Sequence, residues 1–281
     1  MRPERESKYK KLLNYAGFFA AFPAQIYQRK KRMILRAALG MLILAIGSPG
    51  AHATTWSKKT IPDPLADKKD CAVQEPVSYG SYIYEYESKY DQVFWPLTDL
   101  GGIWFCEHSG FTAFVGDFKD VTPTQKTAIA AWLKQNYRGD RSIQGQLRLL
   151  EGIYALRGRN EEFRNHLLRV LARWHQSLGK VEAANRYRRQ AFNGIKVALN
   201  GKLEEERALE YLYLAANYAR LFDDATASDR YLAELSAAIA GIKNEKLNGF
   251  ARYLAALAKQ TPSIQPGGIL DPPGMVTNSD H

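Results

Sequence analysis

The sequence predicts a mainly α-helical protein, an α-solenoid of antiparallel helix hairpins preceded by a small aromatic-rich antiparallel β domain. Apolar residues recur at helical spacing from Thr122 onward, whereas aromatic residues are concentrated in residues 79–118. Helix-breaking positions follow one another at intervals of 21 or 22 residues, at Gly158, Gly179, Gly201, Phe222 and Lys243. Helices of equal length joined by short turns form antiparallel hairpins, and stacked hairpins form a solenoid.

The N-terminal part of the chain carries the pattern of an export signal. Residues 33–53 combine a preceding basic cluster, an apolar run from Ala37 to Gly47 and a small-residue box that ends at Ala53. The apolar run has 11 residues, which is short of the roughly 20 that span a bilayer. We therefore expect a signal peptide cleaved after Ala53 and a periplasmic or secreted protein. The alternatives are a retained membrane anchor and a buried helix.

Residues 1–32 precede this signal and are unusual for a secretory leader. They are expected to be either a non-native extension, with translation starting at Met33, or a long basic n-region. Any membrane contact is expected only through the signal segment.

The positive charge is concentrated in the same N-terminal part. The chain has a formal net charge of +10, but residues 1–53 contain ten Lys/Arg and two Asp/Glu, which leaves +2 for the remainder. A nearly neutral body removes the main argument for binding nucleic acid, so no nucleic-acid partner is expected.

Two cysteines follow the predicted cleavage position. Residues 54–70 are expected to be an extended lead-in, and Cys71 and Cys106 belong to a small β domain over residues 71–120. Paired cysteines outside the cytoplasm are usually oxidised. Closing this loop would stabilise the fold by about 3.8 kcal/mol on the chain-entropy model. The alternatives are metal binding with His108, and a nucleophilic Cys106 with His108 as its base.

The region from Cys71 to Phe118 resembles a small domain found in bacterial proteins of unknown function. In that domain, Cys-x-x-Cys knuckles flank a Tyr/Trp-rich segment, and tetratricopeptide-like helices follow. Here Gln74 and Ser109 stand where the second cysteines of the knuckles would be. The resemblance implies a knuckle-like fold in which a disulfide replaces the metal, so no metal or other cofactor is expected.

The aromatic segment has two interpretations. Short strands are predicted at 103–105 and 111–115, and Tyr82, Tyr84 and Tyr86 also alternate at strand spacing. In the first interpretation the rings form the core of a small domain. In the second, an exposed aromatic platform binds a glycan or a peptide, with carboxylates nearby for polar contacts. The platform residues would be Tyr82, Tyr84, Tyr86 and Trp95, and the carboxylates Asp91, Asp99 and Asp117.

Residues 121–260 are predicted to be the helical repeat domain, and the Pro- and Gly-rich residues 261–281 a disordered tail. Thr122 and Pro123 are typical of a helix start. The stretches 171–191 and 211–235 resemble tetratricopeptide hairpins, because small residues stand where two helices approach closely. Their spacing of 43 residues exceeds the 34 of that family, so the helices are longer than the family pattern.

Charge along the helices is uneven. Residues 157–189 carry nine Lys/Arg and three Asp/Glu, whereas residues 202–234 carry four and eight. These charges are expected either to be solvated or complementary within the stack, or to form a basic concave groove for an acidic partner or peptide tail. Arginine suits such a groove because its planar fork binds carboxylates with two hydrogen bonds. The candidate partner-binding residues are Arg164, Arg169, Arg173 and Arg186.

Two classes of function remain. The favoured one is an exported, non-catalytic protein–protein interaction scaffold of the bacterial cell envelope that binds a protein partner through its helical repeat surface. No nucleotide-binding loop, complete metal-ligand set or catalytic triad motif is evident. The alternative is an envelope hydrolase or thiol enzyme, or a glycan-binding module, in the aromatic region. Its candidate enzymatic residues are Asp91, Asp99, Cys106 and His108.

Overall fold

The computed structural model describes residues 55–78 and 87–271. The predicted extension, the signal peptide and its cleavage position lie outside these residues, as do Tyr82, Tyr84 and Tyr86. Among the residues described, no helix combines the length and apolar character needed to cross a bilayer.

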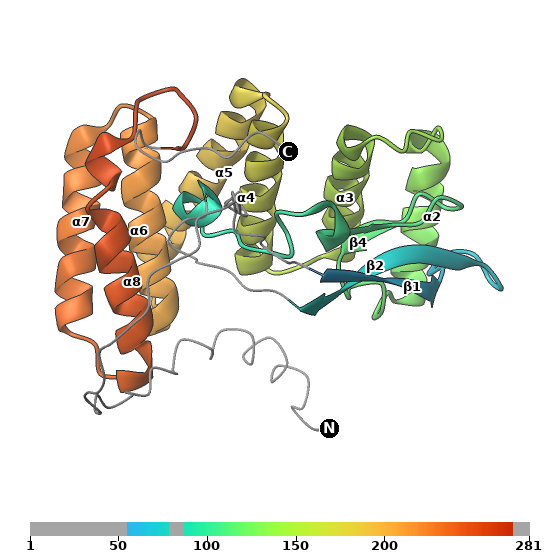
Figure 1. Cartoon of the computed structure of the whole chain (residues 1–281), viewed down its shortest axis with the longest axis horizontal. Coiled ribbons are helices and arrows are strands. Elements are labelled where there is room, and N and C mark those ends of the chain that lie inside the picture. The colour runs from blue at the N-terminus through green and yellow to red at the C-terminus, as the bar shows by residue number, and fades with distance from the viewer. Residues whose placement is uncertain (1–54, 79–86, 272–281) are drawn as a thin grey trace, which may run out of the picture. The chain divides into compact units, whose positions relative to one another are not determined.

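Two small antiparallel sheets precede the helices (Figure 1). Strand β1 (Thr55–Pro62) pairs with β2 (Asp70–Ser78), and β3 (Ile103–Phe105) pairs with β4 (Thr112–Phe114). The short strands predicted at 103–105 and 111–115 are therefore confirmed. Within residues 54–70, expected to be an extended lead-in, Thr55–Pro62 form strand β1, which pairs along its length with the strand that carries Cys71.

Seven helices follow in the described part of the chain. They are α2 (Pro123–Asn136), α3 (Ile143–Arg157), α4 (Glu161–Ser177), α5 (Val181–Leu199), α6 (Glu205–Leu221), α7 (Ala225–Ala240) and α8 (Asn248–Ala258). Every predicted break between residues 158 and 244 falls in a turn between two of these helices. Contacts join α4 to α5, α6 to α7 and α5 to α6, and Figure 1 shows the first two as adjacent antiparallel pairs.

Local sequence sets the helix ends. The Thr122 hydroxyl accepts a hydrogen bond from the Gln125 backbone N–H, and the Gln125 side chain accepts one from the Thr122 N–H. This reciprocal capping box, with Pro123 at the first helical position, starts α2 as predicted. Helix α3 ends at Gly158, whose φ of 60° is a left-handed conformation that glycine adopts without steric cost.

Two hydrophobic cores lie within the described residues. The first joins the strands to α2, α3 and α4, and its buried rings include Trp104, Phe111 and Phe118. The second joins α5 to α8 and includes the ring of Tyr90. Because the strands share their core with the first helices, the β region is an integral layer of the helical fold. Most of the aromatic rings described between residues 103 and 118 belong to this core.

The start of the predicted tail is also packed. Ile264 and Leu270 are buried, the Gly267 N–H donates to the Leu221 carbonyl at 2.7 Å, and the Leu270 N–H donates to the Gln176 side chain at 2.9 Å. The prediction of disorder is thus wrong for residues 261–271. Composition alone could not reveal that two apolar residues anchor a Pro- and Gly-rich segment.

Candidate functional site

The predicted cysteine pair lies at disulfide distance. The sulfurs of Cys71 and Cys106 are 1.99 Å apart, and both residues are buried. The nearly buried Asp63 was not anticipated, and one of its carboxylate oxygens lies 3.0 Å from the Cys106 sulfur. Its other oxygen accepts hydrogen bonds from the Leu65 N–H and the Ser109 hydroxyl. Bonded sulfurs leave no thiol for a nucleophile, so the predicted Cys106–His108 chemistry has no attacking group in this state.

The four candidate arginines occupy very different environments. Arg169 is 1% exposed and lies 2.8 Å from the Glu210 carboxylate, so its assignment to a partner surface is wrong. Arg173 is partly buried, whereas Arg164 and Arg186 are exposed. Arg164 lies 3.6 Å from the Glu161 carboxylate one turn away. Two of the four candidates, Arg164 and Arg186, are therefore exposed at the surface.

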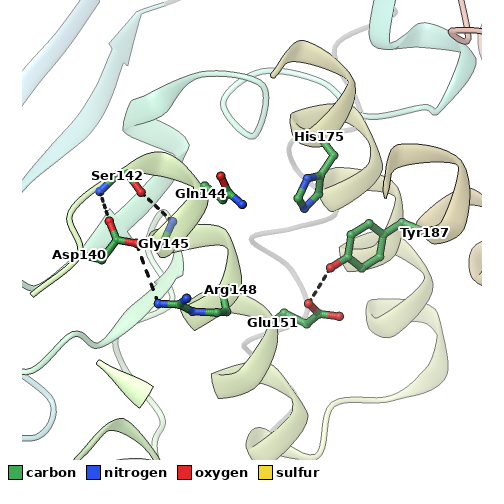
Figure 2. Close-up of a pocket in the computed structure, with 8 residues that line it drawn as sticks. All are labelled: Asp140, Ser142, Gln144, Gly145, Arg148, Glu151, His175 and Tyr187. Atoms are coloured by element: carbon green, nitrogen blue, oxygen red, sulfur yellow. Dashed lines mark hydrogen bonds and ion pairs between the residues drawn. The ribbon is translucent and has the colours of Figure 1, made fainter. Parts of the chain in front are cut away.

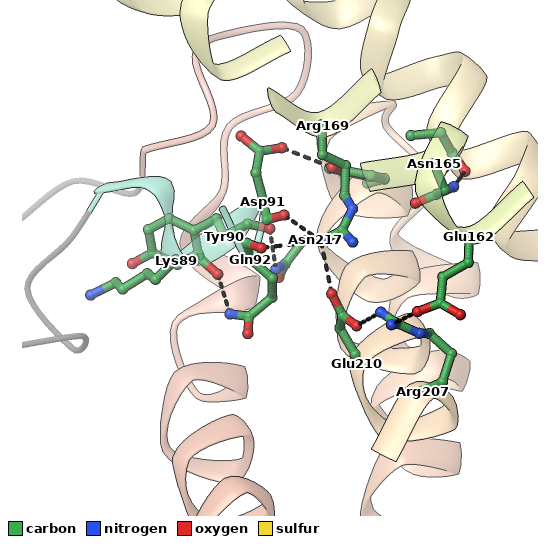
Figure 3. Close-up of polar contacts among 12 residues, drawn as sticks. Lys89, Tyr90, Asp91, Gln92, Glu162, Asn165, Arg169, Arg207, Glu210 and Asn217 are labelled. Atoms are coloured by element: carbon green, nitrogen blue, oxygen red, sulfur yellow. Dashed lines mark hydrogen bonds and ion pairs between the residues drawn. The ribbon is translucent and has the colours of Figure 1, made fainter. Parts of the chain in front are cut away.

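Arg169 instead binds residues 90–92 of the same chain, here called the inserted segment. Its guanidinium donates to the backbone carbonyls of Asp91 at 2.9 Å and Gln92 at 3.2 Å. The Asn217 amide, on α6, donates to the Tyr90 carbonyl at 3.2 Å. Figure 3 shows this segment beside Arg169 and Asn217, with Glu210 on the far side of Arg169. The helices thus bind the backbone of a short turn, at the end of the 3-10 helix Glu87–Tyr90, that precedes Arg169 by 78 residues and Asn217 by 127.

The Asp91 carboxylate of the inserted segment is bound by a second arginine. Arg188, on α5, donates to both oxygens of Asp91, at 3.0 and 2.7 Å, and the Tyr218 hydroxyl donates to one of them at 2.8 Å. Both members of the ion pair are at most 1% exposed. Burial opposes the charged form of Arg188, but Asp91 more than offsets this and raises the pKa of the guanidinium. The basic helices do bind an acidic group, and that group belongs to this chain.

The remaining candidate carboxylates also serve as internal contacts. Asp99 accepts from the Trp56 indole N–H at 3.2 Å. Asp117 accepts from Arg157 at 2.9 Å and Arg159 at 2.7 Å, which fastens the β region to the end of α3 and the start of α4. The candidate enzymatic residues thus have separate structural partners: Asp99 contacts Trp56, Asp91 pairs with Arg188, and Cys106 is bonded to Cys71. They do not form one enzymatic centre.

The aromatic platform can be assessed only at Trp95. Its ring is partly buried and packs against Trp56, with ring centroids 5.2 Å apart. The three tyrosines assigned to the platform lie outside the described residues.

A polar pocket of about 350 Å³ lies between α3 and the α4–α5 pair. Figure 2 shows the eight residues that line it, which are Asp140, Ser142, Gln144, Gly145, Arg148, Glu151, His175 and Tyr187. Gln144, Arg148 and Glu151 follow one another at spacings of four and three residues, so α3 presents them on one face. The opposite wall consists of His175 from the end of α4 and Tyr187 from α5.

The two rings of the pocket are stacked and uncharged. His175 and Tyr187 lie 5.2 Å apart with an interplanar angle of 21°, and the Tyr187 hydroxyl donates to Glu151 at 2.7 Å. Burial, followed by the hydrogen bond to Glu151, raises the pKa of Tyr187 well above its usual value. Burial and the nearby Lys180 lower the pKa of His175, so the imidazole is neutral at pH 7. Its Nδ1 is buried and has no hydrogen-bond partner among the described residues.

The charged groups of the pocket are only loosely paired. Arg148 lies 4.0 Å from the Asp140 carboxylate, and both side chains are more than two-fifths exposed. Hydrogen bonds from Ser142, followed by the charge of Arg148, lower the pKa of Asp140. Lys180 donates to the Gln144 side-chain oxygen. Apart from the helical spacing of the three α3 residues, no sequence pattern indicates this pocket, because residues of its two walls, such as Glu151 and Tyr187, are 36 positions apart.

Comparison with protein-family models, with curated proteins and with solved structures returned no match. The assignment of function therefore depends on the geometry of this chain.

Proposed function

We propose that the protein is an exported, non-catalytic scaffold of the bacterial cell envelope that binds a protein partner through its helical repeat surface. The pairs α4–α5 and α6–α7 would be successive units of a tetratricopeptide-like α-solenoid. The cysteine pair supports export, because structural disulfides persist in oxidising compartments and are rare in the cytosol.

The observation that carries the proposal is the way these helices hold residues 90–92. Arg169 and Asn217 bind main-chain carbonyls, and Arg188 binds a carboxylate with two hydrogen bonds. Contacts to main-chain carbonyls give affinity for a peptide whatever its side chains, and a bidentate arginine selects an acidic side chain. The helical array thus has the chemistry of a surface that binds acidic peptides.

Because residues 90–92 already occupy Arg169 and Arg188, the partner would bind to exposed cations elsewhere on these helices. Arg164 and Arg186 remain at the surface of α4 and α5. An acidic partner or a peptide tail would be drawn to these residues, and the affinity would fall with rising salt concentration.

The test is site-specific photo-cross-linking in intact cells followed by mass spectrometry. A cross-linker at position 190, exposed on α5 one turn beyond Arg186, should capture a defined partner. The combined changes Arg164→Glu and Arg186→Glu should abolish the capture in otherwise folded protein. Arg230→Glu is the matched control, because Arg230 is similarly exposed and also pairs with a glutamate on its own helix. The proposal fails if the double reversal and the control give the same cross-linked products.

A further inference from the structure

We propose that the pocket between α3 and the α4–α5 pair binds a small zwitterion of the α-amino-acid type, with its ammonium at Glu151 and its carboxylate at Arg148. The proposal is independent of the partner surface, because it concerns the pocket interior. The volume of about 350 Å³ lies at the lower end of the range for small-molecule sites. The polar lining suits a hydrophilic ligand.

Arg148 and Glu151, the two opposite charges that α3 presents to the pocket, do not pair with each other. Arg148 and Glu151 are three residues apart on one helix face, where opposite charges are neighbours and commonly pair. No ion pair joins them among the described residues, because Arg148 faces Asp140 and Glu151 accepts from Tyr187. Glu151 has no cationic partner at all within the described part of the chain, although its carboxylate faces the pocket (Figure 2). Two opposite charges thus stand one helical turn apart and face the same space.

Hydrogen-bond donors and acceptors lie at opposite ends of the pocket, with the donors near Gln144 and Arg148. Lys180 occupies the side-chain oxygen of Gln144, which leaves the amide N–H₂ to donate beside Arg148. These groups lie in the first turns of α3, whose partial positive charge also favours a carboxylate. Asp140 opposes an anion there, but its carboxylate already accepts from the Ser142 N–H at 2.9 Å.

Acceptors gather at the other end of the pocket. Among the described residues, the second oxygen of Glu151 accepts no hydrogen bond, and the buried Nδ1 of the neutral His175 ring has no partner. A ligand ammonium placed between them would donate to both groups. The flat His175–Tyr187 stack then forms the wall against which the body of the ligand lies.

Isothermal titration calorimetry on the purified, disulfide-bonded protein tests the proposal. The probes are glycine, alanine, serine, lysine and glutamate, together with N-acetylalanine, which lacks the ammonium, and alanine amide, which lacks the carboxylate. At least one amino acid should bind saturably, and both blocked forms should bind at least about tenfold more weakly, because each leaves a charged group of the pocket unpaired. Alanyl-alanine distinguishes the two sources of this chemistry: tighter binding than alanine assigns the pocket to short peptides, and weaker binding to free amino acids.

Variants locate the site. Glu151→Gln and Arg148→Met should each weaken binding at least about tenfold, whereas the matched changes Glu234→Gln and Arg252→Met, at exposed helix positions, should not. Circular dichroism establishes that each variant is folded. Absence of saturable binding by every probe, equal binding of the blocked forms, or equal effects of the pocket and control variants would overturn the proposal. None of these results bears on cross-linking at position 190, so the two proposals can fail separately.

Discussion

Replacing Asp91 by asparagine removes the charge from one side of a fully buried ion pair while preserving the shape of the side chain. Asp91 accepts both Arg188 bonds and the Tyr218 bond, and the two charged side chains are at most 1% exposed. In the variant the Arg188 guanidinium stays charged and buried, without a counter-ion. The hydrogen bonds from Arg169 go to backbone carbonyl oxygens and remain in place. The substitution therefore tests the contribution of the Asp91 carboxylate alone.

The expected loss of stability is large. Breaking a buried ion pair from one side typically costs about 3–5 kcal/mol, because the remaining charge has lost both water and its partner. For a domain of this size each kcal/mol lowers the melting temperature by about 2–4 °C, which gives a total decrease of about 6–20 °C. Replacing both partners at once, as Asp91→Leu with Arg188→Met, removes the unpaired charge and should recover most of the loss.

Urea unfolding followed by circular dichroism and tryptophan fluorescence provides the measurement. The control is Asp229→Asn, an exposed carboxylate on α7 that should change the free energy of unfolding by less than about 0.5 kcal/mol. The reasoning would be refuted if Asp91→Asn were as stable as this control. It would also be refuted if the double variant lost the sum of the single losses, because the two side chains would then not be coupled.

Three further predictions concern the β region and the first helices. Cys106→Ser should destabilise the protein by about 2–5 kcal/mol, measured by urea unfolding, and dithiothreitol should then have no further effect. Burial, followed by the charges of nearby arginines, lowers the pKa of His166 to about 3. Because the unfolded chain then binds a proton more readily than the folded chain, the free energy of unfolding should fall as the pH drops from about 6.5 toward 3. A smaller decrease in His166→Gln, measured by urea unfolding at several pH values, would support this, and an identical pH profile would contradict it. A Cβ at Gly102 would lie 1.9 Å from the Pro96 carbonyl oxygen, so Gly102→Ala should lower the free energy of unfolding by about 1–3 kcal/mol. Gly201→Ala should not, because the atom nearest to its Cβ would be the Ala198 carbonyl oxygen at 3.4 Å, an ordinary contact.

The parts of the fold that the sequence predicted well are those set by neighbouring residues. Thr122 and Pro123 start a helix because a cap needs only the next turn, and the breaks near Gly158 and Gly179 follow from local backbone geometry. Likewise, Cys71 and Cys106 could be paired because the expected exported chain offered no other thiol. The strand over residues 55–62 was missed because its partner, rather than its own composition, makes it a strand.

Arginine shows most clearly why the site could not be predicted in the same way. Arg164, Arg169 and Arg188 all contributed to one basic stretch of sequence, yet one lies in solvent and two are buried. The difference depends on Asp91, 78 residues before Arg169 and 97 before Arg188, and no local pattern encodes contacts over such separations. Buried arginines require carboxylates or carbonyls, and Arg169 and Arg188 find them in residues 91 and 92, whereas an external acidic partner stays a prediction. What the sequence concealed was that this chain itself supplies the ligand of Arg169 and Arg188, which leaves the exposed Arg164 and Arg186 for an external acidic partner.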